Sequence, residues 1–303
     1  MEHHLAFETT HPAVPGVCMA GIVALGMAVF HPVYLVMSLV GALLSGCVVF
    51  GVRAMGRKLC WLLPMLALVC VANPLFSASG STELTRIGMV AIYAESLAYG
   101  VCMGVMLVGS VLWIEVAAHL IVPERVMATA GRALPTVSLM VSLAAGLVPQ
   151  LLAKAHGTST AISACTCAGR RTDARGTLAQ RSTMLVSWAM EDSLERADAM
   201  RARGWGADAT RTSYRRYEMT ERDMMAIAAL VLLVAASAAL GYVAASQWRF
   251  YPTMPRLAVW WGYLPYATLV LVPGVATLAE RASWSWSARL SVREGAGDER
   301  RYA

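Results

Sequence analysis

The residue of this chain best placed for chemistry is Arg203, at the end of an amphipathic segment. Apolar residues within 182–203 recur near one stripe at helical spacing, which predicts a helix. On it, Asp192 and Arg196 form an i, i+4 pair, and Gly204 can supply a left-handed C-terminal cap. Arg203 then faces the negative end of the helix dipole and can bind a carboxylate through two hydrogen bonds. The alternative is a surface arginine that only compensates the dipole. The stripe comprises Leu185, Trp188, Ala189, Leu194, Ala197 and Met200.

No catalytic constellation accompanies this arginine. The sequence contains no G-x-x-x-x-G-K-[ST], no H-E-x-x-H and no G-x-S-x-G. Its six histidines are scattered, and Cys165 and Cys167 form a C-x-C with no second cysteine pair nearby. We therefore expect a non-catalytic protein that holds neither a metal ion nor a cofactor.

Two acidic residues, Glu95 and Glu115, lie in or beside an apolar stretch. Acids inside a membrane are functional candidates by default. Both are near the predicted ends of the stretch, which favours acids that are capped or reach the interface. Between them, Gly100-x-x-x-Gly104 is a small-residue pattern typical of helix contacts in membranes. We also interpret His11-Pro12 and His31-Pro32 as the starts of helices.

The elements that carry these residues are predicted to be membrane helices. The chain has 303 residues, 57% of them hydrophobic and only 15% charged, whereas soluble domains have about a quarter charged. We predict an all-α membrane protein with about six transmembrane helices and a cytoplasmic or interfacial helical insert. The expected domains are 1–122, 123–221 and 222–303. The expected spans are 13–30, 32–52, 60–76, 96–119, 222–246 and 257–279.

The apolar stretch 134–152 is assigned by charge asymmetry. If it does not cross and the N-terminus is cytoplasmic, 22 of the 25 Lys and Arg residues lie inside, as multi-pass proteins of the cell membrane prefer. We therefore predict cytoplasmic termini and an interfacial helix at 134–152, followed by a short helix at 153–168 and a basic link at 169–176. A plain spanning helix is the alternative. The stretch 134–152 has one small, weakly polar face, which comprises Ser138, Ser142, Ala145 and Pro149.

Several segments, in order along nearly the whole chain, resemble the transmembrane T component of energy-coupling factor (ECF) transporters. The stretch 186–206, VSWAMEDSLERADAMRARGWG, is similar to that family's coupling helix and ends in its Ala-Arg-Gly motif. The other similar segments are His11-Pro12, MAVFHPVYLVMSLVGALL from Met27, LLPMLALVCVANPLF from Leu62, GRALP at 131–135 and WRFYPT at 248–253.

The resemblance implies an energy-coupling subunit without activity of its own. In this family the T component joins two cytoplasmic ABC-type ATPase subunits to a membrane-embedded S component, which captures a vitamin or other micronutrient. Two coupling helices each end in an arginine motif that docks in a groove of one ATPase. Closure of the ATPases moves these helices, and the S component topples and carries its substrate inward. The second motif corresponds to Ala202, Arg203 and Gly204.

The first arginine motif departs from the family pattern and has two candidate registers. Arg170, in Ala168-Gly169-Arg170, matches a variant of the motif, and the neighbouring residues favour it. Arg175, in Ala174-Arg175-Gly176, spells the usual motif but lies only 28 residues before Arg203. In the resemblance the helix at 134–152 is the first coupling helix, and Ser138, Ser142 and Ala145 would contact the S component.

Three other function classes fit the sequence less well. A self-sufficient secondary transporter or channel places paired polar groups and broken helices at the middle of the membrane, whereas the mid-span residues here are mostly Ala, Val, Leu, Met and Gly. A membrane-bound lipid-head-group transferase needs clustered acids or histidines at the interface, and no such cluster can be assembled. Nucleic-acid binding is disfavoured because the basic stretch 151–223 mixes twelve basic with nine acidic residues and has few aromatics.

Overall fold

The structure is a computed structural model of the chain. It describes residues 10–76, 82–87, 90–121, 125–127, 129, 131, 134–166, 174–206, 219–248, 250 and 260–299. The chain divides into two compact units. The first unit combines Met1–Val122 with Glu218–Ala303, and the second is Pro123–Tyr217.

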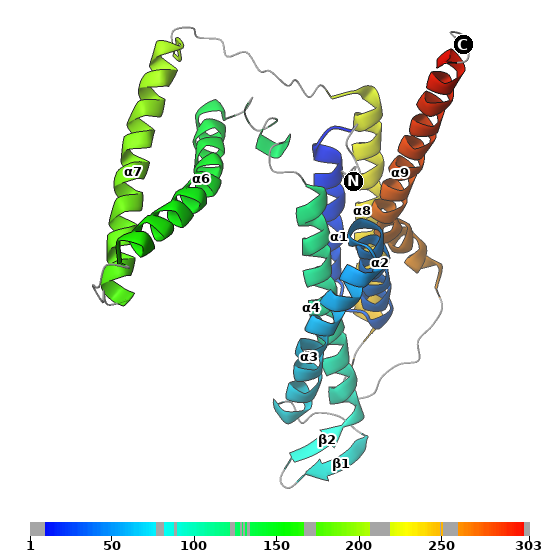
Figure 1. Cartoon of the computed structure of the whole chain (residues 1–303). Coiled ribbons are helices and arrows are strands. Elements are labelled where there is room, and N and C mark those ends of the chain that lie inside the picture. Colours follow the sequence, from blue (N-terminus) through cyan, green and yellow to red (C-terminus); the bar gives the residue numbers. More distant parts are fainter. Residues whose placement is uncertain are drawn as a thin grey trace. The chain divides into compact units, whose positions relative to one another are not determined.

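Helices build the first unit, with one small β-hairpin between α3 and α4 (Figure 1). The two strands are antiparallel, and Ile87 pairs with Val90. The elements are α1 (Ala13–Ala28), α2 (Pro32–Phe50), α3 (Val52–Phe76), β1 (Glu83–Ile87), β2 (Val90–Tyr93), α4 (Ala94–Leu120), α8 (Glu221–Gln247), the 3₁₀ turn η1 (Trp261–Tyr263) and α9 (Leu264–Glu299).

Local sequence signals set several helix ends. The ring Nδ1 of His31 accepts a hydrogen bond from the backbone N–H of Val33 at 3.3 Å, so His31 caps α2 while Pro32 occupies its first position. His11 binds the N–H of Ala13 in the same way, at 3.2 Å. The interpretation of both His-Pro pairs as helix starts is confirmed. Thr220 begins α8 with a capping box.

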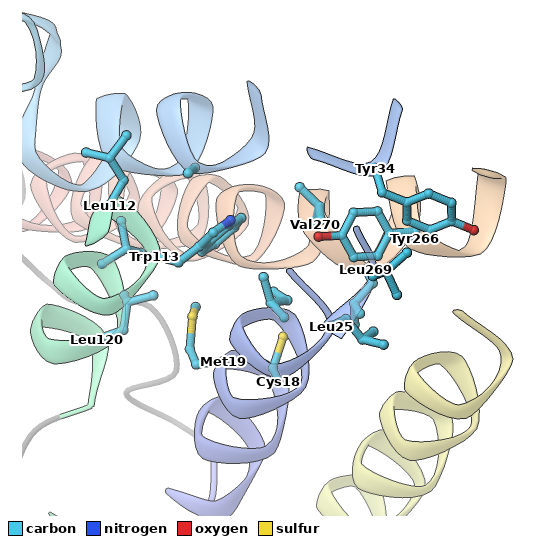
Figure 2. Close-up of a cluster of buried hydrophobic side chains, with 14 of the residues drawn as sticks. Cys18, Met19, Leu25, Tyr34, Leu112, Trp113, Leu120, Tyr266, Leu269 and Val270 are labelled. Carbon is cyan, nitrogen blue, oxygen red and sulfur yellow. The ribbon is translucent and has the colours of Figure 1, made fainter. Parts of the chain in front are cut away.

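The core of the first unit lies where α1, α2, α4 and α9 meet, with α8 against α1 (Figure 2). Trp113 is its largest fully buried side chain, and its indole N–H donates to the hydroxyl of Ser38 at 3.0 Å. The hydroxyl of Tyr34 donates to the carbonyl of Gly262 at 3.1 Å. These bonds satisfy polar groups that would destabilise an apolar interior if left unpaired.

Small residues bring neighbouring helices close together. A Cβ at Gly100 of α4 would lie 3.2 Å from the carbonyl oxygen of Cys70 in α3, and one at Gly104 would lie 3.4 Å from that of Leu66. The predicted role of this glycine pair in helix contact is therefore confirmed. A very close approach is at Gly41, where a Cβ would fall 1.7 Å from Val270 Cγ1.

Six helices of the described chain are long and apolar enough to cross a membrane, by length and composition. They are α2, α3, α4, α8, the portion Trp261–Ser283, and Pro135–Ile162 of the second unit. The predicted fold class, an all-α membrane protein with about six spanning helices, is confirmed, and the hairpin is a small addition to it.

The set of six differs from the predicted one in two places. The expected span 13–30 is the 16-residue α1, which at 1.5 Å per residue extends only about 24 Å. The stretch 134–152, expected at the interface, lies within a helix of spanning length and hydropathy. The length and hydropathy of this helix favour the alternative, a helix that spans the membrane. The charge asymmetry of the sequence favours a helix at the interface.

The second unit contains two long helices, α6 (Pro135–Thr166) and α7 (Ala174–Ala202). The prediction of separate helices at 134–152 and 153–168 is wrong. The backbone continues helically through Pro149, because Leu, Ala and Lys on both sides are strong helix formers. The expected link at 169–176 is also too long, since α7 begins at Ala174 and takes Arg175 and Gly176 into its first turn.

Candidate functional site

The C-terminal end of α7 has a regular capping geometry. Gly204 adopts a positive φ of 79°, so its N–H reaches back to the carbonyl of Arg201 at 3.0 Å. The N–H of Trp205 donates to the carbonyl of Met200, also at 3.0 Å. This pair of bonds is the Schellman motif, and the predicted left-handed cap at Gly204 is confirmed.

The cap places Arg203 directly after Ala202, the last residue of the helix. Its backbone N–H donates to Ala199 at 3.1 Å, and its side chain is exposed. Unpaired carbonyls give this end of a helix a partial negative charge, which holds a cation here favourably. Trp205, 49% exposed, lies two residues further along the chain. The result is a guanidinium and an indole at the tip of a long exposed helix.

Contacts with α6 hold α7 along one face. The guanidinium of Arg196 donates to the side-chain oxygen of Gln150 and pairs with Asp192, with Nε 2.5 Å from Oδ2. The predicted Asp192–Arg196 pair is confirmed. Lys154 of α6 forms a cation–π contact with Trp188 of α7, with Nζ 5.0 Å from the ring centroid. A groove of about 210 Å³ lies between the two helices, lined by Leu143, Ala144, Leu147, Asp192, Ser193, Arg196, Ala197 and Met200.

The apolar stripe of α7 is only partly covered. Leu185, Trp188 and Met200 are half-buried on the side of α6. Leu194, predicted on the same stripe, is 68% exposed. With Met190 it forms an exposed apolar row, because residues four apart share a face. Within this unit, α7 thus keeps apolar surface and a terminal arginine available to another protein.

The structure places the other predicted site residues as follows. Arg175 is in the first turn of α7, at the opposite end from Arg203. Ala168, Gly169 and Arg170 lie outside the described residues and follow the end of α6 at Thr166 in the chain.

The small-residue face of α6 is open in part. Ser142 and Ala145 are exposed, and Ser138 is half-buried with its hydroxyl donating to the carbonyl of Met127 at 2.9 Å. These residues lie together along one helix, so the stripe exists as a surface. Its Ser138 end contacts the helical residues near Met127, whereas Ser142 and Ala145 remain exposed.

Both membrane acids have structural partners, in agreement with the interpretation as capped or end-placed acids. Glu95 is 3% exposed in the first turn of α4 and accepts hydrogen bonds from Thr82, which precedes β1. Glu115 forms an ion pair with Lys58 of α3. Among the residues that the structure describes, no group of three or more His, Cys, Asp and Glu side chains could hold a metal ion.

Replacing Gly204 by alanine should loosen the tip of α7. A Cβ there would meet no atom within 4 Å, so the cost comes from the left-handed backbone alone, about 1–2 kcal/mol. We expect faster amide hydrogen exchange at Arg203 and Trp205 in the full chain. Gly157→Ala, at an unobstructed site inside α6, is the control and should leave these amides unchanged. Unchanged exchange in Gly204→Ala would contradict the capping role.

Neither a scan against protein-family models nor a search of curated proteins found a match for this chain.

Proposed function

We propose that this chain is the energy-coupling transmembrane subunit of an ECF-type ATP-driven importer in the cell membrane, with both termini cytoplasmic. In this role it hydrolyses no ATP. It passes the motion of two ABC-type ATPase subunits to an S component that captures a vitamin or other micronutrient.

The observation that carries this proposal is the placement of Arg203. The arginine directly follows an exposed 29-residue helix and precedes the capping Gly204, in a unit that the sequence inserts between the two segments of the other unit. A planar guanidinium held in this way suits bidentate binding of a carboxylate on a partner. The exposed row at Met190 and Leu194 adds apolar surface beside it.

Arg170 is the better candidate for the first coupling arginine. Arg203 follows the C-terminal end of its helix, and Arg170 follows the end of α6 in the same order along the chain. Arg175 instead occupies a helix N-terminus, where the positive end of the dipole disfavours a cation. The proposal therefore takes Arg170 as the first docking arginine and Arg203 as the second.

The interior of the first unit supports a scaffold more than a self-sufficient transporter. The cavity among α1, α2 and α4, beside Ser38 and Trp113, measures about 10 Å³, which is room for about one water molecule. A pocket for a small organic ligand has hundreds of Å³. This cavity is too small for such a ligand, and the proposal assigns substrate capture to a separate S component.

Transport measurements test the proposal. In vesicles containing the assembled importer, combining Arg170→Glu with Arg203→Glu should reduce uptake to the level seen without ATP, because both docking contacts become repulsive. The matched control combines Arg171→Glu with Arg201→Glu, which changes the charge equally beside each motif and should retain most uptake. Both proteins should elute as single folded species. Normal uptake in the Arg170 and Arg203 variant would refute the assignment of these two positions.

A further inference from the structure

A second groove lies in the first unit, on the surface shared by α3 and α4. It has a volume of about 540 Å³, within the range of small-ligand sites. Its lining residues follow one face of each helix, at i, i+1, i+4, i+5 on α3 and i, i+3, i+4, i+7 on α4. They are Arg57, Lys58, Trp61, Leu62, Val111, Ile114, Glu115 and Ala118, and we refer to them as the α3–α4 groove.

The charges of the α3–α4 groove gather at its Arg57 end and do not cancel. Lys58 pairs with Glu115, and its ammonium also lies 3.5 Å from the centroid of the Phe50 ring. These contacts fix Lys58 in place and neutralise it. Arg57 is exposed, and the structure shows no ion pair for it among the described residues. The groove therefore carries a net positive charge centred on Arg57.

The other end of the groove is apolar and open. Trp61 is 84% exposed, Ile114 54% and Val111 38%. Both helices have the length and hydropathy of membrane spans, and only 6% of the apolar window of α3 is buried. Exposed apolar surface of this kind faces lipid chains. Trp61 lies one turn beyond Arg57 on α3, and tryptophan is enriched where a membrane helix enters the head-group region.

We propose that the α3–α4 groove binds an anionic phospholipid. The lipid phosphate pairs with Arg57, and an acyl chain lies along Trp61, Val111 and Ile114. Basic pockets between membrane helices are suited to anionic head groups. A zwitterionic lipid brings a second, positive group toward Arg57, whereas a free phosphate leaves the apolar wall uncovered. The proposal requires only that α3 and α4 span a membrane, so it stands apart from the coupling function.

Native mass spectrometry of the purified full chain in detergent tests this site. The chain is titrated with phosphatidylglycerol or with phosphatidylcholine of the same acyl composition. We expect phosphatidylglycerol to bind more tightly, and Arg57→Gln to weaken its binding about fivefold or more while weakening the binding of phosphatidylcholine less. Arg57→Lys keeps the charge and should restore much of the preference. Trp61→Ala should weaken both lipids.

The matched control is Arg53→Gln. Arg53 is exposed one turn earlier on α3 and does not line the groove, so its replacement should leave the lipid preference intact. Equal losses in Arg53→Gln and Arg57→Gln would overturn the site in favour of diffuse surface attraction. Displacement of phosphatidylglycerol by millimolar inorganic phosphate would overturn the lipid as ligand.

Photocrosslinking in native membranes distinguishes a lipid from a protein in the groove. With Trp61→p-benzoylphenylalanine, adducts to lipid are expected. A crosslink to a polypeptide in place of lipid would overturn the proposal. A thermal unfolding midpoint equal to that of the unsubstituted chain confirms that each variant is folded.

Discussion

Under the proposed coupling function, Arg203→Glu is expected to weaken binding of the ATPase subunits by about 2–5 kcal/mol, because the proposed desolvated arginine–carboxylate contact would become a contact between like charges. That is a drop in affinity from about 30-fold to several thousand-fold. If Arg203 were only a solvated surface charge, the change would stay within about 1 kcal/mol. Equilibrium binding of the purified ATPase pair to the detergent-solubilised chain measures the difference.

Arg201→Glu provides the matched control for that experiment. Arg201 is exposed in the last turn of the same helix, two residues from Arg203. The substitution changes the net charge by the same amount and leaves the Ala-Arg-Gly motif intact. We expect it to change ATPase binding by no more than about 1 kcal/mol. Equal losses for both variants would mean that the ATPases sense the charge of the helix end and not this arginine.

Gly41→Ala is expected to give the largest loss of stability in the membrane bundle. The new Cβ would overlap Val270 Cγ1 at 1.7 Å and lie 3.4 Å from the ring of Trp113. Both neighbours are buried, so α2 and α9 must move apart or Val270 must change rotamer. Overpacking of this kind costs about 1–3 kcal/mol. Thermal unfolding of the purified chain in detergent measures the loss.

Two further variants identify the cause. Gly109 is a buried helix residue where a Cβ meets nothing within 4 Å, and Gly109→Ala should stabilise the chain by up to about 1 kcal/mol through helix propensity. Combining Gly41→Ala with Val270→Ala removes the overlap, so the pair should be less harmful than the sum of the single changes. Additive losses would rule out the Gly41–Val270 contact as the source.

Features with a local cause could be predicted from the sequence. The His31 cap, the Asp192–Arg196 pair and the Gly204 cap each depend on residues within a few positions of one another. The end positions of Glu95 and Glu115 also followed from the pattern of apolar residues. Their partners, Thr82 and Lys58, did not, because these contacts join separate elements.

The hairpin of β1 and β2 was missed although its sequence carried a signal. Two runs with β-branched residues, 83–87 and 90–93, are separated by two residues, the first of them Gly88. That spacing is typical of a tight β-turn. The strong apolar pattern of the flanking helices masked it.

The continuation of α6 through Pro149 was missed for a different reason. Proline usually ends a helix, but only one backbone N–H is lost and its neighbours favour helix. Likewise, the exposure of Leu194 could not be predicted, since periodicity shows that residues share a face and not which face is covered. The groove between α6 and α7 and the α3–α4 groove each combine side chains from two helices. The sequence alone does not show which residues of two helices lie together.

Co-purification tests the central claim most directly. The chain is co-expressed with the two ABC-type ATPase subunits of its own organism, solubilised in mild detergent and captured by a tag on this chain. The coupling function predicts a stable complex with one copy of each of the three proteins, which Arg203→Glu abolishes and Arg201→Glu preserves. A folded, monodisperse chain that recovers no ATPase would contradict it and would favour a self-sufficient transporter.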